Sequence, residues 1–131
     1  MNKPKTPHFS LAEFERRGKC PQRYWRNIQR LMDALEVIRD RLGGKSITIT
    51  PAGGYRSAKV NKQNKGRASK SQHLYGRAAD IQVKGADPAA VYYVIQELQQ
   101  AGLIPKGGLA AYPRFVHVDI RGRNARWKAA P

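Results

Sequence analysis

The chain has 131 residues, and its 25 Lys and Arg outnumber nine Asp and Glu, so the formal net charge is +16. This length predicts one domain, residues 1–131, with a single modest core. The lack of any run of about 18 apolar residues excludes a membrane-spanning helix. The positive charge favours polyanionic partners, such as nucleic acid, anionic lipid headgroups or cell-wall polymers, without choosing among them.

The N-terminal segment and the lone cysteine indicate where the chain is made. MNKPKTPHFSL is basic but lacks the apolar stretch of a secretory signal, so we expect synthesis in the cytoplasm without a signal peptide. Cys20 has no partner for an internal disulfide, which fits a reducing compartment. Its basic neighbours are expected to lower its pKa. No catalytic motif surrounds it, so we assign it no role.

The first half of the chain is predicted to hold two helices and a strand. Ser10 and Glu13 have capping-box spacing and open a short helix over residues 11–17. A longer helix follows and ends at the glycine pair 43–44. Residues 46–50 are rich in β-branched side chains and predict a strand. The apolar residues of the longer helix recur every three or four positions: Ile28, Leu31, Leu35, Ile38 and Leu42.

The middle of the chain alternates between loop, strand and helix. Residues 52–72 predict a long polar loop with a helical turn, and a loop of that size in a compact domain is often functional. Residues 78–83 predict a strand. A helix then begins at Asp87 and Pro88 and runs to about Ala101. Its expected buried face consists of Val91, Val94, Ile95 and Leu98.

The last predicted elements complete a small sheet. Residues 108–112 and 115–120 are expected to pair as the last two strands, joined by a turn at Pro113. Strands and helices are mixed along the chain, without repeats or low-complexity linkers. We therefore predict an α+β fold: a single compact domain with a small, mainly antiparallel sheet and helices packed on it.

Three residues around the central strand have side chains that bind zinc. His73 and His117 offer imidazole nitrogens, and Asp80 offers a carboxylate oxygen. A His/His/carboxylate set leaves one tetrahedral position open for water, which is the arrangement of catalytic zinc. A structural site would normally be closed by four ligands rich in cysteine. The set therefore predicts a catalytic metal site at the sheet.

The spacing of these residues strengthens the prediction. Gly76 lies between His73 and Asp80 and lets the backbone turn tightly into the strand. Strand alternation places His117 and Asp119 on one face. Two strands can thus present Asp80 beside His117, while His73 arrives from the loop. Taken singly, these would be a loop histidine, a buried strand histidine and a turn-making acid, but their combination favours the metal site.

The segment around the first ligand carries a family resemblance. Five residues match every fixed position of the S-x-H-x-x-G-x-A-x-D signature of the M15 zinc peptidases: Ser71, His73, Gly76, Ala78 and Asp80. The chain resembles this family of D-Ala-D-Ala carboxypeptidases and peptidoglycan endopeptidases, phage endolysins included. The resemblance spans most of the chain, through residues 9–14, 54–57, 115–122 and 126–127. It implies that His73, Asp80 and His117 bind one zinc ion.

The chain departs from the family pattern at two places. Many relatives have serine where this chain has Gly53. Better-known members carry the acid that acts as general base three residues before the last ligand, where this chain has Arg114. Asp119, two residues after His117, is the substitute base that we expect. Since other relatives have a histidine ligand there, metal binding by Asp119 is the alternative.

Four residues are expected to bind the substrate: Arg56, Ser71, Tyr55 and Tyr112. The resemblance implies that Arg56 binds and polarises the substrate near the scissile bond, although a surface arginine is the alternative. Tyr55 is next to Arg56, and Tyr112 is next to the last strand, so both are expected to line a cleft. Five further aromatic residues are expected to pack in the core or on helices: Tyr24, Trp25, Tyr92, Tyr93 and Trp127.

The resemblance implies an endolysin-like peptidase that uses metal-activated water to hydrolyse peptidoglycan stem peptides. Within the family, the resemblance to phage lysins favours cleavage of the L-Ala-D-Glu bond. Trimming of terminal D-Ala or cutting of cross-links is the alternative within the family. A non-enzymatic basic module that binds a polyanion such as nucleic acid is the alternative of another class. No helix-turn-helix, RNA-binding aromatic signature or zinc finger supports it, so no specific nucleic acid is expected.

Two basic runs flank the predicted site, at residues 59–73 and 121–128. We expect them to form a positive rim that faces an anionic cell-wall or membrane surface; an ordinary solvated face is the alternative. The protein is expected to be a monomer and to reach peptidoglycan after holin-mediated release.

Overall fold

The computed structural model describes residues 1–62 and 71–128, and its longest element is helix α1 (Trp25–Arg41). The helix ends at Arg41 with Leu42 as its C-cap, and both glycines of the pair 43–44 that follows have positive φ. Glycine adopts this left-handed conformation without steric cost, so the pair stops the helix as predicted. Four residues of the predicted apolar face are buried, namely Ile28, Leu31, Leu35 and Ile38, whereas Leu42, after the last turn, is half-buried.

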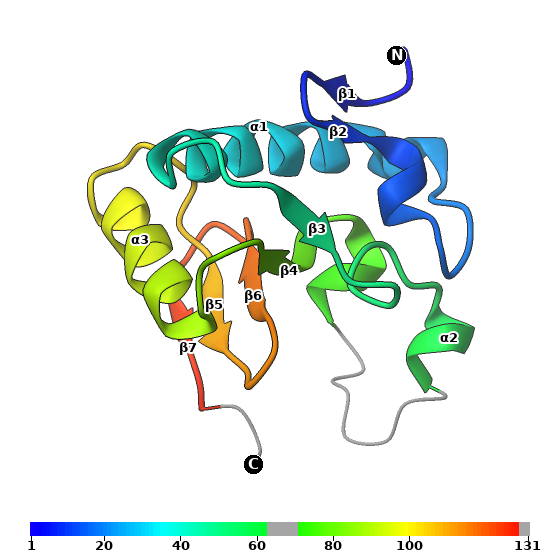
Figure 1. Ribbon diagram of the computed structural model, residues 1–131. Coiled ribbons are helices and arrows are strands. Elements are labelled where there is room, and N and C mark those ends of the chain that lie inside the picture. The colour runs from blue at the N-terminus through cyan, green and yellow to red at the C-terminus, as the bar shows by residue number, and fades with distance from the viewer. Residues whose placement is uncertain (63–70, 129–131) are drawn as a thin grey trace.

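A five-stranded sheet lies below α1, with the strand order β3-β4-β6-β5-β7 (Figure 1). The pairs β3-β4, β4-β6 and β5-β6 are antiparallel, and β5-β7 is parallel. The sheet is therefore mainly antiparallel, as the sequence predicts. Its strands are β3 (Ile47–Ile49), β4 (Ala78–Val83), β5 (Gly108–Ala111), β6 (Val116–Asp119) and β7 (Ala125–Arg126).

Helix α3 (Pro88–Gln100) packs on the sheet and contacts β4, β5 and β6 as well as α1. The Asp87 side chain caps it by accepting a hydrogen bond of 2.9 Å from the Ala90 backbone N–H. Of the face predicted to be buried, Val94 is only half-buried, whereas Gln99, which was not predicted, is buried. The core between helices and sheet includes Leu31, Met32, Ile38, Ile49, Ile81, Ile95, Leu98 and Leu109. The predicted α+β fold with helices packed on a small sheet is confirmed.

The N-terminal segment differs from the prediction. The capping box is present, but it opens only the short 3-10 helix η1 (Leu11–Phe14). The Glu15 carboxylate accepts a hydrogen bond of 2.7 Å from the Cys20 backbone, and Gly18 has φ 127°, so the chain turns where a longer helix was expected. Three further short elements of this segment were not predicted: β1 (Lys5–Thr6), β2 (Phe9–Ser10) and η2 (Gln22–Tyr24).

The predicted polar loop contains the helix α2 (Ala58–Lys62), and η3 (Gln72–Tyr75) begins at its end. Residues 63–70 of that loop lie outside the described residues. The prediction that the strands around Pro113 come last is wrong, because β7 follows them and pairs with β5. In the described part of the chain, no helix is both long and apolar enough to cross a membrane.

Candidate metal centre

His73 reaches the sheet from the 3-10 helix η3. The Ser71 hydroxyl caps this helix by accepting a hydrogen bond of 3.3 Å from the His73 backbone N–H. Gly76 ends it with φ 69° and ψ 25°, a left-handed conformation that favours glycine. The chain can therefore enter β4 directly after the turn, and the His73 side chain is 2% exposed.

Asp80 and His117 lie directly opposite each other in the antiparallel pair β4-β6. Such pairing brings two side chains of the same face together. The Asp80 Oδ1 atom lies 3.1 Å from His117 Nδ1 and 3.3 Å from His73 Nε2. Both aspartate and histidine are buried, each 7% exposed. The register of two strands thus places the carboxylate between the two imidazole rings, as the sequence predicts.

The three side chains fit a zinc ion. One ligand atom from each lies within 4.8 Å of the other two. Tetrahedral zinc with ligand bonds of 2.0–2.1 Å needs ligand atoms about 3.3 Å apart, close to the two separations seen here. Each ring also uses its other nitrogen: His73 Nδ1 lies 2.9 Å from the Gly54 carbonyl, and His117 Nε2 lies 2.8 Å from Asp119 Oδ2. Such partners fix ring orientation in metal sites.

The electrostatics of the cluster favour an ionised carboxylate. Burial alone would raise the pKa of Asp80, but the His73 charge and hydrogen bonds from both histidines lower it to about 2. Burial opposes the charged form of His117, yet its two aspartate partners outweigh burial and raise its pKa. In the metal-free protein a proton on His117 is therefore favoured at the place where a cation would bind.

Asp119 lies in an enclosed position on the Nε2 side of the His117 ring. It is fully buried, and its Oδ1 atom accepts hydrogen bonds from the Gly108 backbone at 2.7 Å and the Arg121 backbone at 3.1 Å. The Arg121 guanidinium donates to both carboxylate oxygens. Burial would raise the pKa of Asp119, but His117, Arg121 and the Gly108 N–H together hold it well below its usual range. A Cβ at Gly108 would collide with the Asp119 carboxylate, so glycine is needed there.

The expected role of Asp119 as general base would require its carboxylate to reach the water at the metal, and the enclosed position does not favour this. The ligand atoms meet on the Nδ1 side of His117, whereas Asp119 contacts Nε2 on the other side of the ring. The alternative, metal binding by Asp119, would likewise require its carboxylate to move from the Nε2 side of His117 to the Nδ1 side. Strand alternation correctly placed both residues on one face, but it carried no information on ring orientation.

Arg56 is buried beside His73. Its Nη2 atom donates to the Ser71 hydroxyl at 3.3 Å, and its backbone N–H donates to the His73 carbonyl at 3.2 Å. Its Nε and Nη1 atoms are buried and have no hydrogen-bond partner among the described residues. A guanidinium held in this way has donors to offer an incoming oxygen. At 3% exposure it is not a surface arginine.

The glycine at position 53 has a structural reason. A Cβ there would collide with the Thr50 hydroxyl and would lie 2.7 Å from the Asp80 Cβ. The Gly53 carbonyl also accepts a hydrogen bond of 2.9 Å from the Asp80 backbone N–H. The side chain found at this position in many relatives would push on the strand that carries the aspartate.

Three aromatic predictions are wrong. Tyr93, expected to pack in the core or on a helix, is 63% exposed. Tyr55 is buried and packs against Tyr24, with ring centroids 6.3 Å apart, so it belongs to the core rather than to a cleft. Trp127, expected in the core, is 37% exposed, and its ring centroid lies 5.0 Å from that of His117. The sequence did carry one sign of its position near the site, because the Arg126-Trp127 pair is among the segments that resemble the family. Tyr112 does line a groove, where its hydroxyl accepts a hydrogen bond from Trp127 Nε1 at 3.0 Å.

Cys20 also differs from the prediction. Burial and the neighbouring Glu15 raise its pKa to about 12, despite the opposing charge of Arg23. The basic residues of the segment are exposed, and water screens them, whereas the thiol is 4% exposed. This cysteine is a core residue.

A small α+β domain with two histidines and one aspartate meeting on a sheet defines a protein of the single-metal, two-histidine-one-carboxylate class. Residues 7–119 match the family model of Peptidase M15, and the chain belongs to this family.

Two curated relatives are similar. The zinc D-Ala-D-Ala carboxypeptidase of Streptomyces albus G is 33% identical over 97 residues, which cover 74% of this chain and 36% of the relative. The probable peptidoglycan L,D-endopeptidase MepK of Haemophilus influenzae is also 33% identical over 97 residues, covering 70% of this chain and 48% of the relative. The matches therefore span less than half of either relative.

Proposed function

We propose that this domain is a zinc-dependent peptidase that hydrolyses peptide bonds in peptidoglycan stem peptides, with His73, Asp80 and His117 holding one zinc ion. The observation that carries the proposal is the meeting of three buried ligand atoms, two of them on directly opposed residues of β4 and β6. Family membership supports it, since one relative is named a zinc carboxypeptidase and the other a peptidoglycan endopeptidase.

Bound zinc supplies a water of pKa about 7 and polarises the carbonyl under attack. We assign Arg56 to the substrate: its Nε and Nη1 donors, which lack partners among the described residues, are available to a carbonyl or carboxylate oxygen of the stem peptide. Ser71 contacts both the Arg56 guanidinium and the His73 backbone. It therefore positions these two residues, in place of the direct substrate contact expected from the sequence.

Asp119 is a positioning residue in this proposal. Its carboxylate accepts a hydrogen bond from the N–H at His117 Nε2, and this tautomer leaves Nδ1 free to bind the metal. Arg121 and the Gly108 N–H hold that carboxylate in place. A base role would require Asp119 to leave these partners and turn to the opposite side of the ring.

The bond we propose is L-Ala-D-Glu, cut in the interior of the stem as by an endolysin. Support comes from the segment 115–122, which resembles the subgroup nearest to phage lysins. The two relatives carry different bond names at equal identity, so the comparisons leave removal of terminal D-Ala or cross-link cleavage as alternatives. The runner-up of another class, a polyanion-binding module, has no specific observation in its favour.

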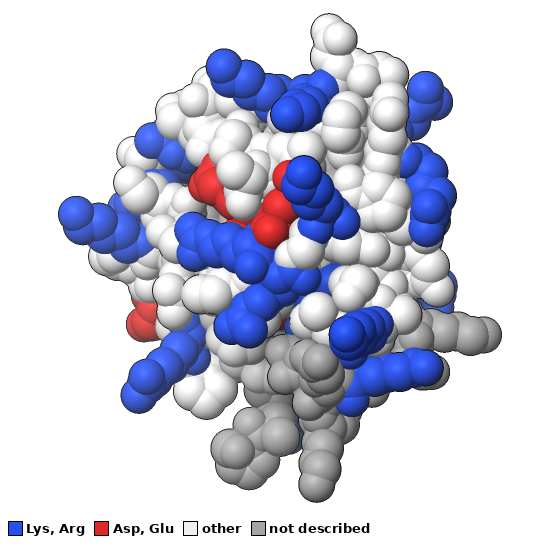
Figure 2. Space-filling view, turned by 90° about the vertical axis from the view of Figure 1, so that its right-hand side faces the viewer, with Lys and Arg blue, Asp and Glu red and all other residues white. Residues whose placement is uncertain are grey.

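The basic surface supports action at an anionic wall. Figure 2 shows a face on which Lys and Arg side chains surround a small acidic area. Lys59 and Lys62 are exposed on α2, while the rest of the basic run at 63–70 lies outside the described residues. We propose that this surface associates with anionic wall polymers, that the protein acts as a monomer, and that it reaches the wall after holin-mediated release. Replacing Lys59 and Lys62 by Gln should weaken wall binding most at low salt.

Mass spectrometry of peptidoglycan tests the reaction. Purified protein with zinc should release fragments whose new termini identify the bond, and a chelator should abolish them. The His73→Ala variant is the matched inactive control. Intact peptidoglycan from several wall types, after incubation with folded zinc-loaded protein, would refute the proposal.

A further inference from the structure

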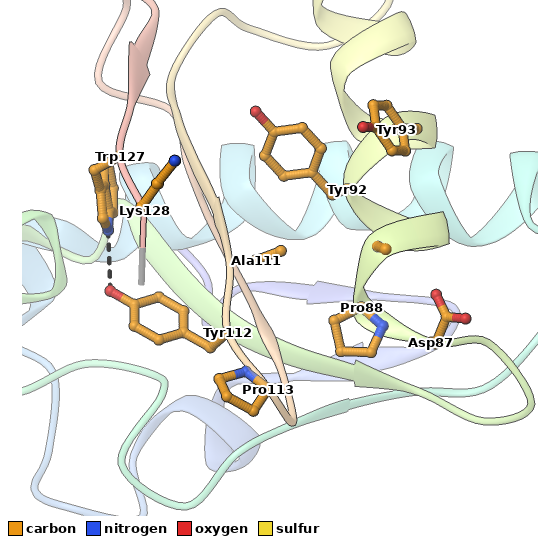
Figure 3. Close-up of a pocket in the computed structure, with 10 residues that line it drawn as sticks. Asp87, Pro88, Tyr92, Tyr93, Ala111, Tyr112, Pro113, Trp127 and Lys128 are labelled. Atoms are coloured by element: carbon orange, nitrogen blue, oxygen red, sulfur yellow. Dashed lines mark hydrogen bonds between the residues drawn. The ribbon is translucent and has the colours of Figure 1, made fainter. Parts of the chain in front are cut away.

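An aromatic groove of about 720 Å³ lies beside the metal centre. It runs between the N-terminal half of α3, the end of β5 and the C-terminal segment (Figure 3). We call it the aromatic groove and define it by Tyr92, Tyr93, Tyr112, Trp127, Asp87 and Lys128. Its volume lies in the range of sites that bind small molecules.

Two of the four rings of the groove are presented to solvent. Tyr93 is 63% exposed and Trp127 is 37% exposed, although large aromatic side chains usually bury most of their surface. Trp127 is nevertheless held in place by the Tyr112 hydroxyl and by the Arg121 guanidinium, which lies 5.5 Å from its ring centroid. Tyr112 in turn stacks on Phe115 at 4.5 Å. An exposed but fixed ring is suited to stacking against a ligand.

The charge of the groove differs from that of the chain. The protein carries a net charge of +16, yet the groove lining has one acid, Asp87, and one base, Lys128. A groove built for the anionic stem peptide or for a polyanion would be expected to gather cations. Aromatic faces with hydroxyl groups and balanced charge instead suit a neutral ligand with an apolar face and a polar edge. Pyranose rings with acetamide groups have this character.

The groove adjoins the metal centre through Trp127, whose ring lies 5.0 Å from His117. In peptidoglycan the stem peptide is joined to the amino sugar through its first residue. A glycan strand in the groove would therefore place the first bonds of the stem, L-Ala-D-Glu included, near His117. Cleavage at the distal D-Ala end would not bring the sugar so close.

We propose that the aromatic groove binds the N-acetylated amino sugars of the glycan strand, and that this contact directs cleavage to the sugar-proximal part of the stem. The cleavage half of this inference rests on the proposed function, whereas sugar binding does not.

Binding is tested with tetra-N-acetylchitotetraose, an N-acetylated sugar without peptide, titrated into ¹⁵N-labelled zinc-loaded protein. The Trp127 indole N–H signal should shift, while that of Trp25, whose indole donates to the Cys20 carbonyl away from the groove, should not. Tyr93→Ala should weaken binding by about tenfold. Leu103→Ala, which removes an exposed apolar side chain outside the groove lining, should leave the affinity unchanged.

Cleavage is tested by comparing a disaccharide-linked stem peptide with the same peptide freed from its sugar. The wild-type protein should have the higher kcat/KM on the sugar-linked form, and Tyr93→Ala should reduce that ratio. No shift of Trp127 with the oligosaccharide, or a shift of Trp127 produced instead by the sugar-free peptide, would overturn the glycan assignment. Sugar binding without any hydrolysis would support glycan binding by the aromatic groove and refute the proposed peptidase activity. Hydrolysis without sugar binding would support the peptidase activity and refute glycan binding by the groove.

Discussion

The Nε2 atom of His117 lies 2.8 Å from Asp119 Oδ2, while its Nδ1 atom lies 3.1 Å from Asp80 Oδ1. One imidazole ring thus separates Asp80, which the sequence assigns to the metal, from Asp119, for which metal binding was the alternative to a general-base role. Asp80 shares the side of the ring where His73 also points, and Asp119 is enclosed by β5 and Arg121. The orientation of this ring therefore places Asp80 with the proposed metal site and leaves Asp119 as the hydrogen-bond partner that orients His117.

Replacing Asp119 by Ala should weaken zinc binding by roughly 10- to 100-fold, because His117 loses the partner that orients its ring. Asp119→Asn can still accept a hydrogen bond but carries no charge, so its zinc affinity should lie between those of the wild-type protein and Asp119→Ala. A competition titration with a chromogenic chelator measures the affinity, and Asp33→Asn is a control in the exposed part of α1. Unchanged zinc affinity with a large loss of kcat would restore the general-base role.

His73→Ala, Asp80→Ala and His117→Ala should each lose the single zinc ion, since two remaining ligands bind zinc weakly. His8→Ala removes the third histidine of the chain, which pairs with Glu36 at the surface, and should keep full zinc content. Elemental analysis of dialysed protein gives the zinc-to-chain ratio. Retention of zinc by any of the three variants would remove that residue from the ligand set.

The metal-free protein should lose stability at both acidic and alkaline pH. The pKa of Asp80 is lowered to about 2, so its contribution, about 2 kcal/mol, is present above its ordinary pKa near 4 and is lost as pH falls towards 2. The pKa of His117 is raised, so its contribution is present below about 6.5 and is lost as pH rises through the folded-state value. Thermal unfolding in chelator should therefore give the highest Tm at about pH 5.

Zinc should reverse the alkaline part of this profile, because metal binding needs unprotonated imidazoles. The zinc-loaded protein should have a higher Tm at pH 8 than at pH 5. Asp80→Asn should reduce the acidic loss in the metal-free protein, and the part that remains comes from Asp119, whose pKa is also lowered. A metal-free profile that rises steadily from pH 5 to pH 8 would contradict the charged His117–Asp119 pair.

Replacing Arg56 by Met should lower kcat on stem peptides by about 10²- to 10³-fold, the usual cost of removing a donor that stabilises developing negative charge. The methionine keeps an apolar stem in a buried position and removes the charge. Zinc content should remain unchanged, which separates this effect from loss of the metal. Arg23→Met, at an exposed arginine over the Tyr24 ring, is the matched control. An unchanged kcat would place Arg56 in a structural role.

The sequence alone determined the elements that depend on neighbouring residues. The three- and four-residue apolar spacing of α1, the Asp87-Pro88 start of α3 and the left-handed turn at Gly76 follow from local backbone preference and hydrophobic periodicity. The spacing of His73, Asp80 and His117 was sufficient to predict that they meet. The hairpin β1-β2 and β7 are too short to leave a periodic signal, so they were missed.

Only the tertiary structure decided the roles around these ligands. Which nitrogen of His117 faces Asp80, whether Asp119 is open or enclosed, and whether Tyr55 or Trp127 stands beside the metal centre all depend on contacts between residues far apart in the chain. Strand alternation assigns a face to a side chain but neither its rotamer nor what packs behind it. Here the Gly108 N–H, the Arg121 guanidinium and the register of β4 with β6 supply that information.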